Sequence, residues 1–395
     1  MDHQHKFLQL LRSPDETNVK LALEMAKGLS EINISQILQD YLELYQCLVS
    51  NRLKKRVQAK HIVLLNQAEI QASQNNISTL PDCLGDLPHL QTLHLSQNQI
   101  TQLPPSLRNL PTLKTLYLRA NKLKALPTEV PHLKTLQKLH LGLNLLTQLP
   151  ESLSNLTTLE YLGLQVNSLT RLPENIGNLS NLSEISAYNN QLVALPESIG
   201  SLSNLKILRL NNNQLNQLPD SIGNLSSLQQ LYLSNNSLTE LPRSIGKLPN
   251  LHSLHIENNQ LTKLPKEIGN IPILLDLRLN NNQLAQLPSS IGNLQNLQVL
   301  YLPNNQLTEL PESVGHLPDL KDLHLTGNRL AHLPESLGNL PNLETLRLRD
   351  NELTSLPASL MNLKNLRRLY LRGNPLPPSV IEKIKSALPH CRIDI

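Results

Sequence analysis

Tyrosine, histidine and arginine recur at one position of a 23-residue period in this chain. Tyrosine and arginine provide large contact areas with polar ends, and both are enriched among the residues that dominate protein–protein binding. Histidine adds a ring that titrates near neutral pH. These residue types favour recognition of a partner over bond-making chemistry. From residue 232 to residue 370 the position reads Tyr232, His255, Arg278, Tyr301, His324, Arg347 and Tyr370.

Related residues occupy the same surface earlier in the chain. Six of the eight tyrosines fall on this set of positions, and core packing does not explain that bias. The candidate binding residues are therefore the seven above together with His94, Tyr117, His140, Tyr161, Tyr188 and Arg209.

Motifs for catalysis and for metal binding are not found in the sequence. There is no GxSxG, HExxH, GxGxxG or phosphate-binding loop. His94 and His140 are two repeats apart, and strands spaced about 4.8 Å would leave them about 10 Å from each other, too far to share a metal ion. The sequence thus predicts a protein without enzymatic activity, metal or cofactor.

An asparagine recurs with the same 23-residue period and indicates where the tyrosine, histidine and arginine residues lie. Before it the chain reads LxxLxLxxN, as in Leu90, Leu93, Leu95 and Asn98. Side chains alternate along a strand, so leucines face inward while the residue between them, here His94, faces outward. The asparagine amide can satisfy buried backbone groups where the strand ends. The asparagines are residues 75, 98, 121, 144, 167, 190, 213, 236, 259, 282, 305, 328, 351 and 374.

The second half of each repeat reads NxLxxLPxxIGxL and predicts turns. Proline lacks an amide hydrogen, so the Leu-Pro pairs favour turns and short 3-10 segments on the convex side. Nine of thirteen glycine positions in this frame carry glycine, which we expect to serve a tight bend. The other four carry Arg108, Pro131, Ser154 and Met361.

Residues 1–60 lack the repeat and read as helices. Ser13 is expected to cap a helix that starts at Pro14 and stops at Gly28. A second apolar pattern predicts a helix over 34–49. A basic run then follows, interpreted as a solvated face or, alternatively, as a site for an anionic partner: Arg52, Lys54, Lys55, Arg56 and Lys60.

The C-terminal end also departs from the repeat. The pattern over 380–388 predicts a helix in place of the last convex turn. Leu388, Cys391 and Ile393 restore the LxxLxL frame and predict a closing strand. Such a strand would cover the open edge of the sheet, which otherwise invites aggregation.

The repeat frame resembles the 23-residue class of leucine-rich repeat proteins, the Ras-suppressor and scribble-like type, especially its free-standing bacterial members. The resemblance covers roughly residues 61–395 and implies an α/β solenoid. We expect a horseshoe with a curved parallel sheet on its concave face. Its parts would be a helical cap (1–60), one degenerate and thirteen full repeats (61–374) and a helix-strand cap (375–395). Members of this class are generally protein-binding scaffolds.

Composition narrows the location and the partners. The net charge of +4 with 17% charged residues is too near balance to argue for nucleic acid. No apolar stretch reaches about 18 residues, and the first residues do not read as a signal peptide. Cys47, Cys83 and Cys391 lie far apart, which favours a reducing compartment. The sequence therefore predicts a cytoplasmic protein without a membrane span.

The leading functional hypothesis is a protein-interaction module or scaffold that binds a protein partner through its concave face. Ladder contacts between the column residues, or duplication of three repeats, could produce the same pattern without binding. The alternative function is binding of RNA or another phosphorylated polyanion. Its basis is a C-terminal cluster, Arg347, Arg349, Arg367, Arg368 and Arg372, although Glu257, Asp276 and Asp322 would repel a long strand. The column histidines further predict pH-sensitive binding.

Overall fold

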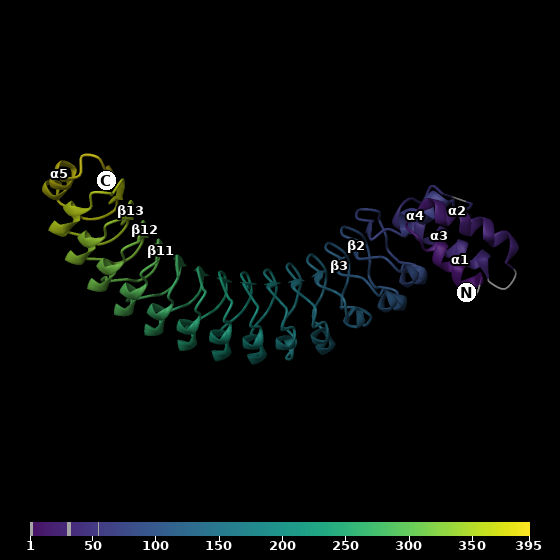
Figure 1. Cartoon of the computed structure of the whole chain (residues 1–395). Helices are drawn as coiled ribbons and strands as arrows, with labels where there is room; N and C mark the ends of the chain where they lie inside the picture. Colours follow the sequence, from purple (N-terminus) through teal and green to yellow (C-terminus); the bar gives the residue numbers. More distant parts are fainter. Residues whose placement is uncertain (1–2, 30–32, 54) are drawn as a thin grey trace. The chain divides into compact units, whose positions relative to one another are not determined.

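The computed structural model describes residues 3–29, 33–53 and 55–395. It comprises two compact units, Met1–Leu182 (unit 1) and Ser183–Ile395 (unit 2), which are described separately. In Figure 1, unit 1 runs from purple to teal and unit 2 from teal to yellow.

Helices form the N-terminal part of unit 1. Tyr41 donates a hydrogen bond to the Asn66 side chain (2.9 Å), and Asn66 in turn donates to the Leu11 carbonyl (2.8 Å), so this buried network joins three helices. The Asn75 amide donates to the Leu48 carbonyl (3.0 Å), which ties the end of a helix to the first repeat. The helices are α1 (His3–Leu11), α2 (Glu16–Met25), η1 (Ala26–Gly28), α3 (Ile34–Leu48) and α4 (Ala59–Leu65).

The start of α2 differs from the prediction by two residues. Asp15, not Ser13, caps the helix, and its carboxylate accepts from the backbone of Thr17 (2.8 Å) and Asn18 (3.1 Å). A carboxylate is favoured here because it also faces the positive end of the helix dipole. The helix over 34–49 is confirmed as α3. Of the basic run, Lys54 lies outside the described residues, and the other four side chains are exposed.

Parallel strands follow in chain order in unit 1, with 3-10 turns between them. Strand pairing keeps a 23-residue register, as in Leu93 opposite Leu116. Ile70 and Ala72 are buried, as the degenerate opening repeat predicts. The elements are β1 (Glu69–Gln71), η2 (Asp82–Asp86), β2 (Thr92–His94), η3 (Pro105–Asn109), β3 (Thr115–Tyr117), η4 (Val130–His132), β4 (Lys138–His140), η5 (Glu151–Asn155), β5 (Tyr161–Gly163) and η6 (Ile176–Asn178).

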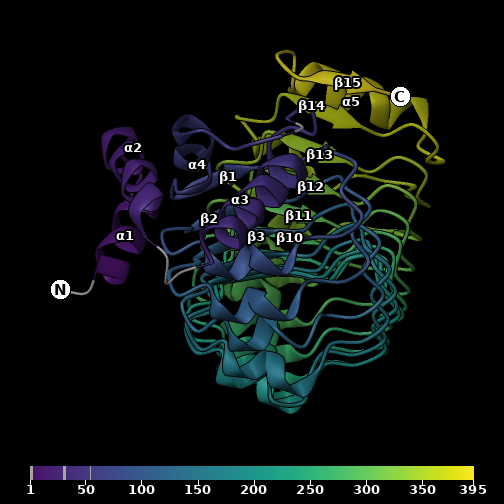
Figure 2. The same cartoon turned by 90° about the vertical axis from the view of Figure 1, so that its right-hand side faces the viewer.

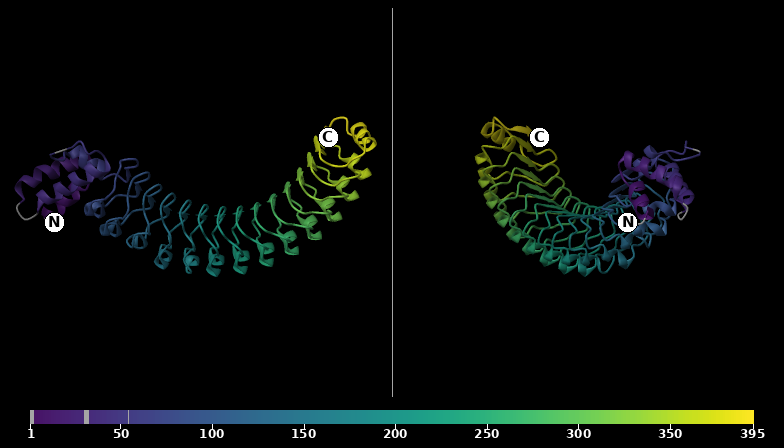
Figure 3. Two further views of the ribbon diagram at one scale, coloured as in Figure 1. Left: turned by 180° about the vertical axis from the view of Figure 1, so that it is seen from behind. Right: turned by 45° about the vertical axis from the view of Figure 1, so that its right-hand side comes forward.

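Unit 2 repeats the same alternation, with strands along one side and turns along the other (Figure 3). Its strands are β6 (Glu184–Ser186), β7 (Ile207–Arg209), β8 (Gln230–Tyr232), β9 (Ser253–His255), β10 (Asp276–Arg278), β11 (Val299–Tyr301), β12 (Asp322–His324), β13 (Thr345–Arg347) and β14 (Arg368–Tyr370). Its turns are η7 (Glu197–Ser201), η8 (Asp220–Asn224), η9 (Arg243–Lys247), η10 (Lys266–Asn270), η11 (Ser289–Asn293), η12 (Glu312–His316), η13 (Glu335–Asn339) and η14 (Ala358–Asn362).

The asparagine ladder is confirmed in both units. Asn259, for example, is 7% exposed and accepts a hydrogen bond from the backbone of Leu238 (3.0 Å). Its amide donates to the carbonyls of Leu233 and Ile256, both at 3.0 Å. One side chain thus satisfies backbone groups of its own repeat and of the preceding one, which would otherwise be buried without partners.

The residue before each of these asparagines adopts a left-handed conformation, a feature that the sequence analysis missed. Asparagine and glycine tolerate positive φ, whereas a β-branched residue there is a genuine outlier. In unit 1 the position holds Gln74, Gln97, Ala120, Leu143 and Val166, the last with φ of 57°. In unit 2 it holds Asn189, Asn212, Asn235, Asn258, Asn281, Asn304, Gly327, Asp350 and Gly373.

Glycine in the turns lies within 3-10 segments and also allows close contact between repeats, which the sequence analysis did not predict. Positive φ is not found at Gly85 or Gly223. Instead, a Cβ on Gly223 would lie 2.3 Å from the Ser244 carbonyl oxygen in the next turn. After Arg108 and Ser154, which carry a Cβ, the next turns (η4 and η6) contain three residues rather than five. The turn after Pro131, η5, still contains five residues, so a Cβ at this position is not by itself enough to shorten the following turn.

The C-terminal cap contains the predicted helix and strand, α5 (Pro378–Ala387) and β15 (Arg392–Asp394). The strand register differs from the prediction, because Leu369 pairs with Ile393 rather than with Cys391. The shift of two residues keeps the same side chains facing inward. It arises because α5 replaces a 3-10 turn, so the cap no longer follows the 23-residue period. Figure 2 shows β15 beside β14.

Candidate binding surface on the sheet

The strands of each unit present three outward positions, which together form the sheet face. The central column holds the residue four places before each asparagine. In unit 1 it reads Gln71, His94, Tyr117, His140 and Gly163, and in unit 2 it reads Ser186, Arg209, Tyr232, His255, Arg278, Tyr301, His324, Arg347 and Tyr370. The register of β15 adds Asp394 to the unit 2 column, a residue that the sequence analysis missed.

Four of the candidate residues form one ring stack in unit 1. His94 and Tyr117 have ring centroids 4.4 Å apart at 11°, and Tyr117 and His140 are 4.3 Å apart at 17°. Tyr161 continues the stack from His140 at 4.5 Å. At the outer end, His94 Nε2 lies 3.0 Å from Glu69 Oε1. The rings therefore support one another across neighbouring strands.

Tyr161 joins this stack although it belongs to a flanking position. The central residue of its strand is Gly163, and a Cβ there would lie 2.8 Å from the Tyr161 ring. Glycine thus leaves the space that the ring occupies. Gln165 similarly covers Gly142, where a Cβ would lie 2.6 Å from the glutamine side chain. Two small residues let two larger neighbours lie over the sheet in unit 1.

Charged pairs and rings alternate at the start of the unit 2 column. The Arg209 guanidinium pairs with Glu184 and lies 5.7 Å from the Tyr232 ring centroid. Tyr232 in turn meets His255 edge to face, with centroids 4.9 Å apart at 89°. Such cation–π and edge-to-face contacts are attractive because of the ring quadrupole. Each residue is therefore held by the next one in the column.

Asp276 joins two column residues in the middle of unit 2. Its carboxylate lies 3.1 Å from His255 Nε2 and 3.1 Å from Arg278 Nε. Burial raises its pKa, but hydrogen bonds from His255 and Arg278 outweigh burial and hold the pKa below the usual value. The aspartate is therefore ionised and fixes the guanidinium of Arg278, whose side chain is 43% exposed.

His324 is the most constrained histidine of this column. Its ring meets Tyr301 edge to face at 4.3 Å, and its Nε2 lies 3.0 Å from Thr326 Oγ1. Burial and the nearby Arg347 charge lower its pKa to about 4. In unit 1, burial and the charges of Lys138 and His94 similarly lower the pKa of His140 to about 4. Both rings stay neutral near neutral pH, so the prediction of pH-sensitive binding is wrong for these two histidines.

Arginines enclose the last tyrosine of unit 2. Arg347 and Arg349 lie 5.6 Å and 4.9 Å from the Tyr370 ring centroid. Arg347 Nη1 donates to both oxygens of Asp322 (2.8 and 2.9 Å), and Arg349 Nε donates to Asp394 (2.7 Å). Two arginines of the proposed polyanion cluster are thus already paired with carboxylates.

The structure brings the candidates together in two sets, four in unit 1 and eight along the unit 2 column. Tyr188 lies in a flanking position of unit 2. All thirteen side chains are partly buried. The ladder contacts expected of a structural pattern are therefore real, and the partly exposed edges remain free for other contacts.

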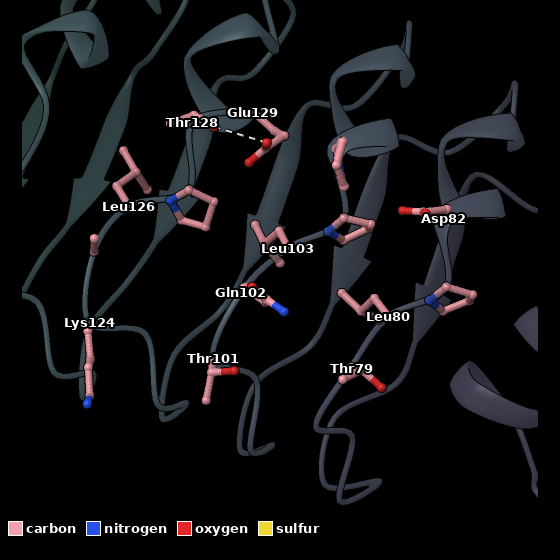
Figure 4. Close-up of a pocket in the computed structure, with 15 residues that line it drawn as sticks. Thr79, Leu80, Asp82, Thr101, Gln102, Leu103, Lys124, Leu126, Thr128 and Glu129 are labelled. Carbon is pink, nitrogen blue, oxygen red and sulfur yellow. Dashed lines mark hydrogen bonds between the residues drawn. The ribbon is translucent and has the colours of Figure 1, made fainter.

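A hollow of about 800 Å³ lies elsewhere on unit 1, between the asparagine turns and the 3-10 turns (Figure 4). Leu80, Leu103 and Leu126 line it from three successive repeats, together with the prolines that follow them. Thr101, Lys124 and Glu129 add polar groups. No central-column residue lines the hollow, so it is separate from the sheet face.

The described ranges, 3–29, 33–53 and 55–395, contain neither a clustered metal site nor a membrane-spanning helix. Within them, no group of three or more histidine, cysteine, aspartate or glutamate side chains is arranged to hold a metal ion. No helix there has the length and apolar character that a membrane span requires.

Comparison with known proteins identifies the class that this fold and surface define. The family described as "Leucine-rich repeat region" matches residues 105–194, 194–281 and 266–329. Two related families, both described as leucine rich repeat, match residues 318–376 and 89–110. The chain belongs to the leucine-rich repeat proteins, as the resemblance in the sequence predicts. No curated protein gave a match.

Solved structures agree with this assignment. A leucine-rich repeat protein of Leptospira interrogans is 38% identical with a TM-score of 0.75, over 81% of this chain and 82% of that one. The plant peptide hormone receptor RGFR1, solved with RGF2, is 30% identical with a TM-score of 0.60. The match covers 81% of this chain but only 61% of the receptor, less than two thirds of its length. An internalin of Listeria monocytogenes (23% identity, TM-score 0.65, 91% of this chain and 96% of that one) shows the shared fold.

Proposed function

We propose that this chain is a non-enzymatic protein-interaction module, or scaffold, that binds a protein partner through its sheet face. The central column of unit 2 is its principal contact. The observation that carries the proposal is a series of local contacts along the column, in which neighbours fix rings and guanidinium groups that are still partly exposed. They run from Glu184 to Arg278, between Tyr301 and His324, and from Asp322 to Asp394. Side chains held in place before binding lose little entropy on binding, which favours affinity.

The area of the unit 2 face supports the same proposal. Ten strands about 4.8 Å apart, each presenting about 17 Å of chain, give a face of about 800 Å², close to what one partner contributes to a standard protein complex. The plant receptor RGFR1, a relative in fold and family, was solved with RGF2. Recognition of a protein or peptide is therefore the function we assign to this face.

Affinity capture from the native organism, followed by mass spectrometry, would supply the candidate partner. Tyr301→Ala and Arg278→Ala should then each weaken binding to the purified partner by about tenfold or more. Arg243→Ala removes the same charge from an exposed site on η9 and should leave affinity unchanged. Urea unfolding should show little loss of stability for Arg278→Ala, because its ion pair is half exposed. Unchanged affinity in both column variants would show that the partner binds elsewhere.

Polyanion binding, the alternative function, has less support. Arg347 and Arg349 hold Asp322 and Asp394, and Arg367 lies 3.8 Å from Glu344. Only part of the predicted arginine cluster thus remains for RNA.

We also propose a cytoplasmic location. Cys47, Cys83 and Cys391 are free, and burial raises the pKa of their thiols to about 11, 12 and 11, respectively. Such thiols are poorly reactive, as suits a reducing compartment. Cell fractionation checks the location, and recovery of the protein outside the cytoplasm would contradict it.

A further inference from the structure

Two arginines lie directly opposite each other at the C-terminal end of unit 2. The register of β14 and β15 pairs Arg368 with Arg392, and both side chains are exposed on the sheet face. Like charges opposite each other destabilise a sheet. Within unit 2, no carboxylate lies within ion-pair distance of either arginine. The pair therefore has a charge that no carboxylate of unit 2 neutralises.

The nearby carboxylates are engaged elsewhere. Asp394 pairs with Arg349, Asp322 pairs with Arg347, and Glu344 lies beside Arg367. Arg372, the next outward residue after Tyr370, is also exposed. The outward side of this end of the sheet thus carries three arginines that form no ion pair with a carboxylate of unit 2: Arg368, Arg372 and Arg392.

We propose that Arg368 and Arg392, with Arg372 beside them, bind a phosphorylated side chain of the protein partner. This inference rests on the proposed function of the sheet face. Guanidinium groups present planar sets of donors that match phosphate oxygens. A phosphorylated side chain carries a charge of about −1.5 to −2 and three acceptor oxygens, enough for two neighbouring arginines. A carboxylate carries a single charge and suits one arginine.

The arrangement favours a short anionic group over a nucleic acid strand. A polynucleotide repeats its charge along its whole length. Further along the unit 2 face, Arg209 is paired with Glu184 and Arg278 with Asp276, so this part offers little net positive charge to such a strand. The uncompensated positive charge is limited to the end of the sheet, where a single phosphate would fit.

A binding experiment with defined probes tests the site. The probes are a labelled peptide with one phosphoserine among neutral residues, its unphosphorylated twin and an oligouridylate of equal length. Fluorescence anisotropy of the full chain should show binding of the phosphopeptide and not of its twin. Arg368→Gln and Arg392→Gln should each weaken that binding about tenfold. Arg329→Gln removes an exposed charge on another side of unit 2 and should have no effect.

Two outcomes would overturn the inference. One is equal binding of the phosphopeptide by the wild type and by the Arg368→Gln, Arg392→Gln double variant. The other is tighter binding of the oligouridylate with a steep salt dependence, which would indicate a polyanion site. Neither outcome affects the measurement of partner affinity in the Tyr301→Ala and Arg278→Ala variants, so the two proposals can fail separately.

Thermal unfolding supplies a measurement that does not depend on peptide affinity. Without anions, Arg392→Gln should raise the melting temperature slightly, because it removes repulsion from Arg368. Inorganic phosphate should raise the melting temperature of the wild type more than that of the double variant. An equal rise in both proteins would contradict a phosphate site at these arginines. Far-UV circular dichroism of each variant checks that the cap is still folded.

Discussion

Units 1 and 2 use the same leucine and asparagine frame but differ at the position before the asparagine. Both place that residue at positive φ. Unit 2 fills most of these positions with asparagine, and Asn281 and Asn304 each donate to the asparagine of the preceding repeat (2.6 and 2.7 Å). Unit 1 places Ala120, Leu143 and Val166 there instead. The buried frame thus imposes a backbone conformation that the local residue itself disfavours.

The turns show a second difference between the units. In unit 2, glycines from Gly200 to Gly338 leave room for the carbonyl of the following turn. Unit 1 replaces this glycine at Arg108, Pro131 and Ser154, and the turns η4 and η6 are shorter. Identical core packing therefore permits two kinds of contact between neighbouring turns.

The sheet faces differ in their chemistry as well. Unit 1 presents a stack of four nearly parallel or tilted rings, whereas unit 2 alternates rings with ion-paired arginines. A frame that fixes the core leaves the outward positions free to vary. The difference is consistent with a principal binding role for unit 2, as proposed above.

The largest effect is expected at a close contact between two neighbouring turns of unit 2. Gly223→Ala places a Cβ about 2.3 Å from the Ser244 carbonyl oxygen, so the backbone of η9 must move. Overpacking of this kind should lower the free energy of unfolding by about 2 to 3 kcal/mol. Urea unfolding followed by circular dichroism measures the loss.

Its matched control in unit 1 is Ser154→Ala. That change removes only the hydrogen bond from Ser154 Oγ to the Glu151 carbonyl (2.7 Å) and should lower the free energy of unfolding by about 1 kcal/mol. Equal losses in the two variants would mean that the turn contacts do not distinguish the units.

A smaller effect is expected at the left-handed position. Val166→Asn in unit 1 should raise the free energy of unfolding by about 1 kcal/mol, because asparagine tolerates positive φ and valine does not. The reverse change in unit 2, Asn258→Val, should lower it by about 1 to 2 kcal/mol. Urea midpoints measure both. A loss of stability in Val166→Asn would show that packing, not backbone conformation, determines the residue at this position.

The smallest effect concerns pH and should be common to both units. The native pKa of His140 and of His324 is lowered from 6.5 to about 4. Below pH 6.5 the unfolded chain takes up protons that these native rings do not, so stability should fall from about pH 6.5 towards pH 4. His140→Gln and His324→Gln should each reduce that slope, measured by urea unfolding at several pH values. His316→Gln, at an exposed site on η12, serves as control and should retain it.

The sequence correctly predicted the features that follow the 23-residue period. Its predictions were less accurate in the two caps, where that period does not apply. Asn259 and its equivalents, the strands and the 3-10 turns all follow from spacing and residue type. At α2, Ser13 and Asp15 are both good caps two residues apart, and only the contacts decide between them. At β15 the cap helix interrupts the count, so strand pairing rather than spacing sets the register.

Side-chain directions on the sheet face were also beyond the sequence. The residues of the central column were predicted. The position of the Tyr161 ring was not, because it depends on the space that Gly163 leaves by having no side chain. The left-handed position could have been found, since asparagine precedes the ladder asparagine in six consecutive repeats from Asn189 to Asn304. In unit 1, Leu143 and Val166 conceal that signal, because they show no preference for positive φ.

The contact between a turn glycine and the serine of the next turn has a consequence for how such a chain can lengthen. A 23-residue segment cut from Gly200–Ser313 brings its own 3-10 turn and its own glycine. A duplicated segment therefore forms the same turn-to-turn contact with each neighbouring repeat. Duplication of three repeats together also preserves the Tyr, His, Arg order. If the same segment were inserted after Arg108 or Ser154, the Cβ of that residue would occupy the space that the carbonyl of the inserted turn needs. Growth by whole repeats is thus easier within unit 2, where the column that we propose binds the partner also repeats.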